Sequence, residues 1–314
     1  MFAYLANLLI LTGIAAILAA SLNLVLGYAG IFSAAQAVFY GVGAYTAALV
    51  ALHYTDSFLL ATLVAMLVAA VAGLLLAVPA LRIKEEYFVV ASLGFQLTGY
   101  TIFSEWSSLT GGFAGLVGIP PARILGWQAT GHGDYLLLTV LCALIVFAVL
   151  TLLVHSPLGR EFKAIRDNES AALALGKNPV VLRVIAVSLG GALAAVGGSL
   201  YSFYIAFVNP ESFTLSQSIL FMAMVILGGA GTLVGPIIGA VFITVFPALL
   251  TFLDIPHQVM GPLQQIVYGL AMILLMIYQP DGLIGLWLRL VKWIRARRGS
   301  ATPSDRALPG GVAR

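Results

Sequence analysis

The sequence has very little charge and a single cysteine. Lys, Arg, Asp and Glu together make up 9% of the 314 residues, whereas 61% are hydrophobic. A water-soluble domain carries about 25% charged residues, so this set could not cover the surface of one. Several stretches reach the length of about 20 apolar residues that a helix needs to cross a bilayer. The composition therefore predicts a membrane protein with several transmembrane helices.

Charge is also missing from the interior of the apolar stretches. All acidic and basic residues lie in predicted loops or near the ends of these stretches. Proton-coupled carriers keep ionisable groups inside the membrane to relay protons. Proton-driven transport is therefore disfavoured, whereas sodium coupling through backbone carbonyls stays open.

Patterns for catalysis and metal binding are missing as well. Cys142 lies alone in an apolar run, and the four histidines, at 53, 132, 155 and 257, have no partner at i+3 or i+4. No His or Lys lies in an apolar stretch to activate a serine, and no G-x-x-x-x-G-K-[ST] phosphate loop occurs. We therefore expect no catalytic site, metal or cofactor in this chain; if ATP supplies energy, a separate subunit binds it.

Nine apolar stretches are candidate transmembrane segments. They cover residues 2–26, 31–52, 57–79, 87–104, 135–154, 183–207, 215–230, 236–253 and 262–279. Glycines cluster at 27–43 and 215–239, where we expect broken or re-entrant helices. The predicted fold is an all-α membrane protein, a polytopic helical bundle with about 8–10 transmembrane segments. It occupies residues 1–288, with a loop at 155–183, and a basic, partly disordered tail follows at 289–314.

The basic residues predict the orientation. Fourteen of the fifteen lie at 80–86, at 155–183 and at the C-terminus; the remaining one is Arg123. Regions rich in Lys and Arg stay in the cytoplasm, and nine spans put all three on the same side. We therefore expect the N-terminus outside and the C-terminus in the cytoplasm. The loops at 53–57, 105–134, 208–214 and 254–261 then lie outside.

Neutral polar residues inside the spans have two interpretations. Each could bond to a neighbouring helix, which is the commoner role, or line a path for a solute. Position beside the glycine-rich stretch favours a path, and the residues we predict for it are Gly27, Gly30, Ser33, Gln36 and Gln96. Residues 26–30 (LGYAG) and 227–231 (LGGAG) are similar, which reflects either a duplication or chance in a glycine-rich chain.

The loop at 155–183 contains a predicted amphipathic helix. Ser156 suits the N-cap, Pro157 the first helical position and Gly176 the residue after the end, which predicts one helix of about nineteen residues. Its apolar residues recur at helical spacing: Leu158, Phe162, Ile165, Ala172 and Leu175. Such a face either lies on the lipid surface or docks in a groove of a partner, and periodicity does not decide between them.

Six motifs follow one another between about residues 15 and 290. They are 87–95 (YFVVASLGF), 108–112 (SLTGG) leading to 118–120 (GIP), 159–169 (GREFKAIRDNE) through Gly176, 209–213 (NPESF), 227–236 (LGGAGTLVGP) and 278–285 (YQPDGLIG). Their order and spacing resemble the LivM-type permeases of branched-chain amino acid ABC importers. Similar permeases serve urea, amides and aromatic acids. A secondary carrier or channel that works without ATP is the alternative from another class.

The resemblance implies an assembly in a bacterial inner membrane. This chain would pair with a LivH-type second permease, two cytoplasmic ATP-binding subunits and a periplasmic substrate-binding protein, with lipid around it and no nucleic acid. The helix at 156–176 would couple the permease to the ATPase through Gly159, Arg160, Phe162, Ile165, Arg166, Asp167, Asn168 and Glu169. Thr110, Gly111 and Gly112 would lie near the face that meets the binding protein.

Overall fold

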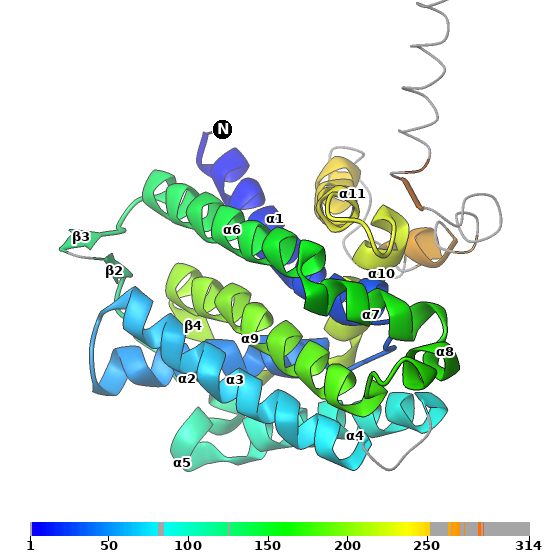
Figure 1. Cartoon of the computed structure of the whole chain (residues 1–314). Helices are drawn as coiled ribbons and strands as arrows, with labels where there is room; N and C mark the ends of the chain where they lie inside the picture. Colours follow the sequence, from blue (N-terminus) through cyan, green and yellow to red (C-terminus); the bar gives the residue numbers. More distant parts are fainter. Residues whose placement is uncertain are drawn as a thin grey trace, which may run out of the picture.

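The computed structural model describes residues 2–80, 85–124 and 126–251, with 263–264, 266–270, 273, 282–283 and 285. These residues are mostly helical (Figure 1), as the composition predicted. The long helices are α1 Phe2–Asn23, continued by the π-helical turn η1 Leu24–Tyr28, α2 Gln36–His53, α3 Phe58–Ala80, α4 Glu85–Glu105, α6 His132–His155, α9 Pro179–Ile205, α10 Leu215–Gly228 and α11 Gly235–Thr251. The all-α fold class is confirmed.

Short elements connect the long helices. They are α5 Ser107–Thr110, η2 Gly112–Ala114, β1 Leu116–Val117, β2 Arg123–Ile124, β3 Trp127–Gln128, α7 Pro157–Asp167, α8 Glu169–Ala174, β4 Phe207–Val208 and η3 Pro210–Phe213. Strand β1 pairs antiparallel with β4, and β2 pairs antiparallel with β3. These two-residue strands join loops to one another and form no layer of their own.

Four of the described helices are long and apolar enough to cross a membrane. They cover Ala3–Tyr28, Phe58–Ala77, His132–His155 and Pro179–Ile205, and α10 and α11 are apolar but shorter. Eight of the nine predicted segments coincide with helices. The ninth, at 262–279, and the tail at 289–314 lie largely or wholly outside the described residues.

Small residues bring the central helices into close contact. Helix α9 lies against α1, α2 and α3. A Cβ added at Gly43 would lie 2.4 Å from the Cα of Ala195, and one added at Gly198 would lie 2.3 Å from the carbonyl oxygen of Tyr40. Lipid tails are as apolar as Leu, so helices in a membrane associate largely through such close backbone packing.

The outer sides of α3 and α6 are aliphatic and exposed. The side chains with the largest exposed fraction there are Leu63, Leu67 and Leu75 on α3 and Leu144, Ile145 and Leu152 on α6. A soluble monomer rarely exposes so large an apolar surface. Together with the helix lengths, this makes the chain a multi-pass membrane protein.

The loops sort to two ends of the bundle. At one, here called the strand end, the amide of Arg123 donates to the carbonyl of Asp56 (3.2 Å). The hydroxyl of Tyr204 donates there to Oδ1 of Asn7 (2.7 Å), which brings the N-terminal part of α1 to this end. Helices α7 and α8 lie at the other, the α7 end (Figure 1). The basic segment 155–183 therefore lies at one end of the bundle, and the described loops that the basic residues predict to lie outside are at the other.

Candidate functional site

The segment 156–176 forms two helices, so the prediction of one continuous helix is wrong. The chain turns at Asn168 (φ −161°, ψ 104°), whose side chain accepts a hydrogen bond from the amide of Ala171 (3.0 Å). Asn is among the best N-cap residues, and Glu169 suits the first turn that follows. The side chain of Asn168 therefore starts α8 where an uninterrupted helix would have continued.

The predicted ends of the segment are confirmed. Ser156 caps α7 by accepting from the amide of Gly159 (3.4 Å), and Pro157 is the first helical residue. Gly176 follows α8 with φ 76°, a conformation that glycine adopts without strain. A Cβ at Gly159 would lie 2.3 Å from the carbonyl oxygen of Val154, so α7 starts in direct backbone contact with α6.

The apolar stripe of this segment is buried only in part. Phe162, Ile165 and Ala172 are buried, whereas Leu158 is 37% exposed and Leu175 78% exposed. The charged residues lie mostly outside, and two ion pairs link Lys177 to Glu161 (2.5 Å) and Arg183 to Glu169 (2.9 Å). The Lys177–Glu161 pair is exposed and adds little to stability, whereas the Arg183–Glu169 pair is partly buried. The outward face of α7 and α8 is thus polar, with three exposed leucines, Leu158, Leu173 and Leu175.

Arg166 reaches from α7 back into the bundle. Its Nη1 donates to the carbonyl oxygen of Gly27 (2.7 Å), while Nε and Nη2 bond to Asp167 (3.0 and 2.9 Å). The last carbonyls of a helix have no partner within it, and a cation at that end is favoured by the helix dipole. Lys163 lies 5.5 Å from the ring centroid of Tyr28, so a second cation of α7 faces the same turn.

Two glycine-rich breaks meet beside Arg166. The first break covers residues 29–35, between η1 and α2, and the second covers 229–234, between α10 and α11. Asn23, the last residue of α1, links that helix to the second break: its Nδ2 donates to the carbonyl of Thr232 (2.7 Å), and its Oδ1 accepts from the amide of Gly231 (2.8 Å). A Cβ at Gly27 would lie 2.3 Å from the nitrogen of Gly231. The two similar segments of the sequence therefore lie against each other.

We call this cluster the glycine joint. It consists of Gly27, Gly30, Gly231, Asn23 and Arg166. Gly30 and Gly231 have φ of 72° and 77°, and a Cβ at Gly30 would lie 2.6 Å from Cγ of Arg166. Side chains at these glycines would separate the backbones that the joint brings together.

Of the residues predicted to line a path, Gln96 is fully buried and fully bonded. Its Oε1 accepts from the amide of Val38 (3.1 Å) and from the hydroxyl of Ser218 (3.1 Å), and its Nε2 donates to the carbonyl of Phe213 (2.9 Å). Gln36, 3% exposed, donates to the carbonyl of Leu18 and the hydroxyl of Ser21. Both glutamines hold helices together in this conformation, and their place in a path stays a prediction.

The other members of that set belong to the first break. Ser33 is buried, and its hydroxyl accepts from the amide of Ala35 (3.4 Å). The amides that follow are bonded by side chains from distant helices, Ala34 to Ser92 of α4 (3.0 Å) and Ala37 to Ser218 of α10 (2.8 Å). Broken backbone at membrane depth needs such partners, because lipid offers none.

Thr110, Gly111 and Gly112 lie at the strand end, in the turn after α4. Thr110 is buried, and its hydroxyl donates to the carbonyls of Phe103 and Trp106 (2.9 and 2.8 Å). Gly111 and Gly112 both have positive φ, 75° and 61°. These three residues shape the turn, and contact with another protein at this face stays a prediction.

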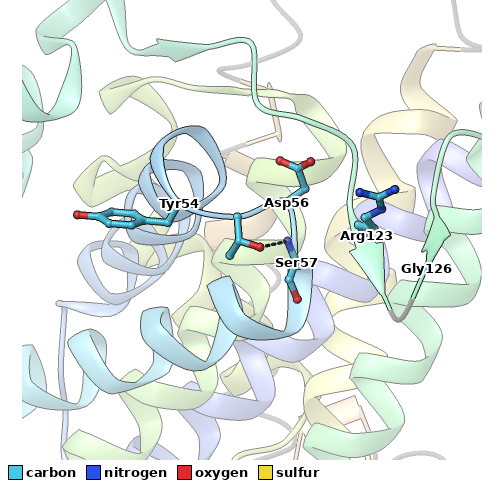
Figure 2. Close-up of a pocket in the computed structure, with 6 residues that line it drawn as sticks. Tyr54, Asp56, Ser57, Arg123 and Gly126 are labelled. Carbon is cyan, nitrogen blue, oxygen red and sulfur yellow. Dashed lines mark hydrogen bonds between the residues drawn. The ribbon is translucent and has the colours of Figure 1, made fainter.

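The strand end also has a hollow that sequence reasoning missed. It has a volume of about 490 Å³ and is lined by Tyr54, Thr55, Asp56, Ser57, Arg123 and Gly126 (Figure 2). Asp56 and Arg123 give it both signs of charge, and Tyr54 is 86% exposed. The one available signal in the sequence was that Arg123 is the only basic residue of the loops predicted to lie outside.

Sequence reasoning also left several residues of the α7 end without a role. Asn23 is one of the neutral polar residues of the predicted spans, and the sequence shows 26–30 and 227–231 only as similar segments. Asn23 lies four residues before Gly27, on the same face of the helix, which places it next to the break. Within the described ranges, no group of three or more His, Cys, Asp or Glu could hold a metal ion.

Comparison with known proteins matches nearly the whole chain. A model of the family described as "Branched-chain amino acid transport system / permease component" matches residues 4–276. The high-affinity branched-chain amino acid transport system permease protein LivM of Salmonella typhimurium is 31% identical over 242 residues, which cover 69% of this chain and 55% of that protein. The LivM protein of Escherichia coli is 31% identical over 244 residues, or 70% and 56%. The chain thus aligns with little more than half the length of these relatives.

Two further relatives also match this chain. A probable LivM permease of Methanocaldococcus jannaschii is 27% identical over 237 residues, covering 72% of this chain and 68% of that protein. The autoinducer 2 import system permease protein LsrC of Salmonella paratyphi B is 32% identical over 176 residues, covering 54% and 49%. No solved structure matches the chain significantly.

Proposed function

Because this chain belongs to the family of permease components of branched-chain amino acid transport systems, we propose that it forms part of the transmembrane path of an ABC importer for these amino acids. Its relatives include permeases named for branched-chain amino acid transport. ATP is bound and hydrolysed on two separate subunits. A LivH-type second permease and a periplasmic substrate-binding protein complete the assembly. The chain itself is a transport component and has no catalytic site.

The observation that carries this proposal is that α7 is bonded to the bundle on one side and exposes charged residues on the other. Its Arg166 bonds to Gly27 at the first break (2.7 Å), while Arg160 and Asp167 lie exposed on the segment. A partner that binds the exposed side can displace such a helix, and the bonds on its other side transmit the displacement to the spans. The exposed side docks in the ATPase subunit.

The membrane orientation follows from the same segment. Arg160, Lys163, Arg166, Lys177 and Arg183 put five positive charges at the α7 end, and the positive-inside rule assigns such a region to the cytoplasm. The strand end then faces the periplasm, where the turn at 110–112 and the hollow beside Arg123 face the binding protein. We infer a bacterial inner membrane with the C-terminus in the cytoplasm.

Reconstitution in vesicles tests the proposal. This chain, its partner permease, both ATP-binding subunits and the binding protein should together take up leucine only when ATP is present. Leaving out any one of them should abolish uptake. Uptake by this chain alone would overturn the proposal, and uptake that stops with an ionophore and ignores ATP would favour a secondary carrier.

The substrate is tested separately. The similarity to an autoinducer 2 permease shows that this sequence type also occurs in a protein named for another solute. Competition for uptake by unlabelled leucine, isoleucine and valine is expected, with little competition by urea, amides or aromatic acids. The reverse ranking would keep the importer and change its substrate.

A further inference from the structure

At each break the helical hydrogen-bond ladder stops, and a new helix begins after it. The first separates α1 and η1 from α2, and the second separates α10 from α11. A helix bends most easily where its ladder is interrupted. Left independent, the two breaks would let four helices move separately at the α7 end.

Asn23 removes part of that independence. It is 2% exposed, lies on α1, and uses both polar atoms of its amide on the second break, at Thr232 and Gly231. Both bonds go to backbone atoms and run in opposite directions, one as donor and one as acceptor. The amide therefore fixes the position of the second break relative to α1.

Arg166 brings α7 into the same contact. Its Nη1 bonds to Gly27 of η1, just before the first break, and lies 2.9 Å from where a Cβ of Gly231 would be, on the second break. That same position lies 3.1 Å from the carbonyl oxygen of Gly27. A Cβ at Gly30 of the first break would lie 2.6 Å from Cγ of Arg166, so this one side chain lies against both breaks.

We propose that Asn23 and Arg166 are positioning residues that make α7 and the two glycine breaks move as one unit during transport. A displacement of α7 then moves the inner ends of α1, α2, α10 and α11 together. This inference rests on the proposed importer function. It adds the route by which a displacement of α7 reaches the helices that form the transport path.

The first test measures uptake per ATP hydrolysed in the reconstituted complex. Asn23→Ala and Arg166→Ala should each lower this ratio about tenfold, the factor expected from losing one or two partly buried hydrogen bonds. The double variant should be no worse than the single ones, because both break the same unit. Thr12→Val is the matched control on α1, since among the described residues the hydroxyl of Thr12 bonds only to Leu8 of its own helix.

The outcomes separate the two proposals. If the wild-type complex takes up leucine with ATP, the proposed importer function is supported. A wild-type ratio for Asn23→Ala, or two single effects that multiply in the double variant, would then overturn the inference alone. Equal losses in Thr12→Val would also overturn it, because they would mean that any lost hydroxyl or amide in α1 disturbs transport.

A second measurement leaves Asn23 and Arg166 intact, in case their variants fail to assemble. Spin labels are placed at cysteines replacing exposed residues in a Cys142→Ala background: Ala164 on α7, Phe32 in the first break, Val234 in the second and Leu67 on α3. Between nucleotide-free and ATP-bound complex, the distances from 164 to 32 and to 234 should stay constant. The distance from 164 to 67 should change by about 2 Å or more. A change at one break without the other would contradict a single unit.

Discussion

The two glycine breaks adjoin similar sequences, 26–30 and 227–231, but are held in different ways. Within and just after the first break, the amides of Ala34, Ala37 and Val38 are bonded by side chains of α4 and α10. After the second, Thr232 serves the break from within: its hydroxyl accepts from the amide of Gly235 (3.0 Å) and donates to the carbonyl of Gly229 (2.8 Å). A similar local sequence therefore produces a break that depends on distant helices in one case and a largely self-supporting one in the other.

This difference predicts where stability is concentrated. The first break ties α2 to α4 and α10, so its loss should affect the whole bundle. Among the described residues, the second is tied to the rest of the chain by the hydrogen bonds of Asn23 and by close contacts with Arg166 and Gly282. The variants below test this ranking, from the largest expected effect to the smallest.

Gln96→Leu should cause the largest loss of stability. It leaves the carbonyl of Phe213 and the hydroxyl proton of Ser218 without a partner in a buried site, while the amide of Val38 keeps its bond to the carbonyl of Ala35 (3.2 Å). An unpaired buried polar group costs about 1–3 kcal/mol, so the two together should cost about 2–6 kcal/mol. Thermal unfolding of the purified protein in detergent measures it.

The control for Gln96→Leu is Thr98→Val on the same helix. Thr98 is exposed, and its hydroxyl bonds only to Gly94 of its own helix (2.8 Å). Equal melting temperatures for the two variants would mean that the first break does not depend on α4.

Gly27→Ala should come next. The added Cβ would lie 2.0 Å from Oδ1 of Asn23 and 2.3 Å from the nitrogen of Gly231, so the breaks must separate. Overpacking of this kind costs about 1–3 kcal/mol. Gly94→Ala is the matched control, because a Cβ there meets no atom within 4 Å and alanine favours a helix by up to about 1 kcal/mol. Gly27→Ala should unfold at a lower temperature than Gly94→Ala. A destabilised Gly94→Ala and an unchanged Gly27→Ala would refute the close contact between the breaks.

Thr232→Val should have the smallest effect, about 1 kcal/mol, because it removes a cap-like bond at the start of α11. Hydrogen exchange should rise at 229–235 and stay unchanged around Gln36. Thr244→Val, which loses a bond within α11, is the control. A loss as large as that of Gln96→Leu would remove the distinction between the two breaks.

Much of this architecture could be predicted from the sequence. Apolar length located the described spans, and glycine clusters located both breaks, because both are local properties of the chain. Pairings were out of reach: Gln96 bonds to Val38, 58 residues away, and Arg166 to Gly27, 139 residues away. One sequence contains no information on which of many polar groups meet across a bundle.

The candidate site was predicted in outline and wrong in one detail. Ser156, Pro157 and Gly176 set the ends of the α7 and α8 segment, and their capping preferences are strong enough to read locally. The turn at Asn168 was missed because helical periodicity continues across it. An Asn followed by Glu is an N-cap pattern, so a local signal existed.

The central claim is that α7 passes a displacement driven by ATP to the spans through Arg166. Arg166→Glu removes the bond to Gly27 and places a negative charge beside a carbonyl oxygen. Lys177→Gln, which loses only a surface ion pair, is the control. In the reconstituted complex, Arg166→Glu should insert normally and keep ATP hydrolysis while ATP-dependent leucine uptake falls at least about tenfold. Uptake at the wild-type rate in Arg166→Glu would contradict the account.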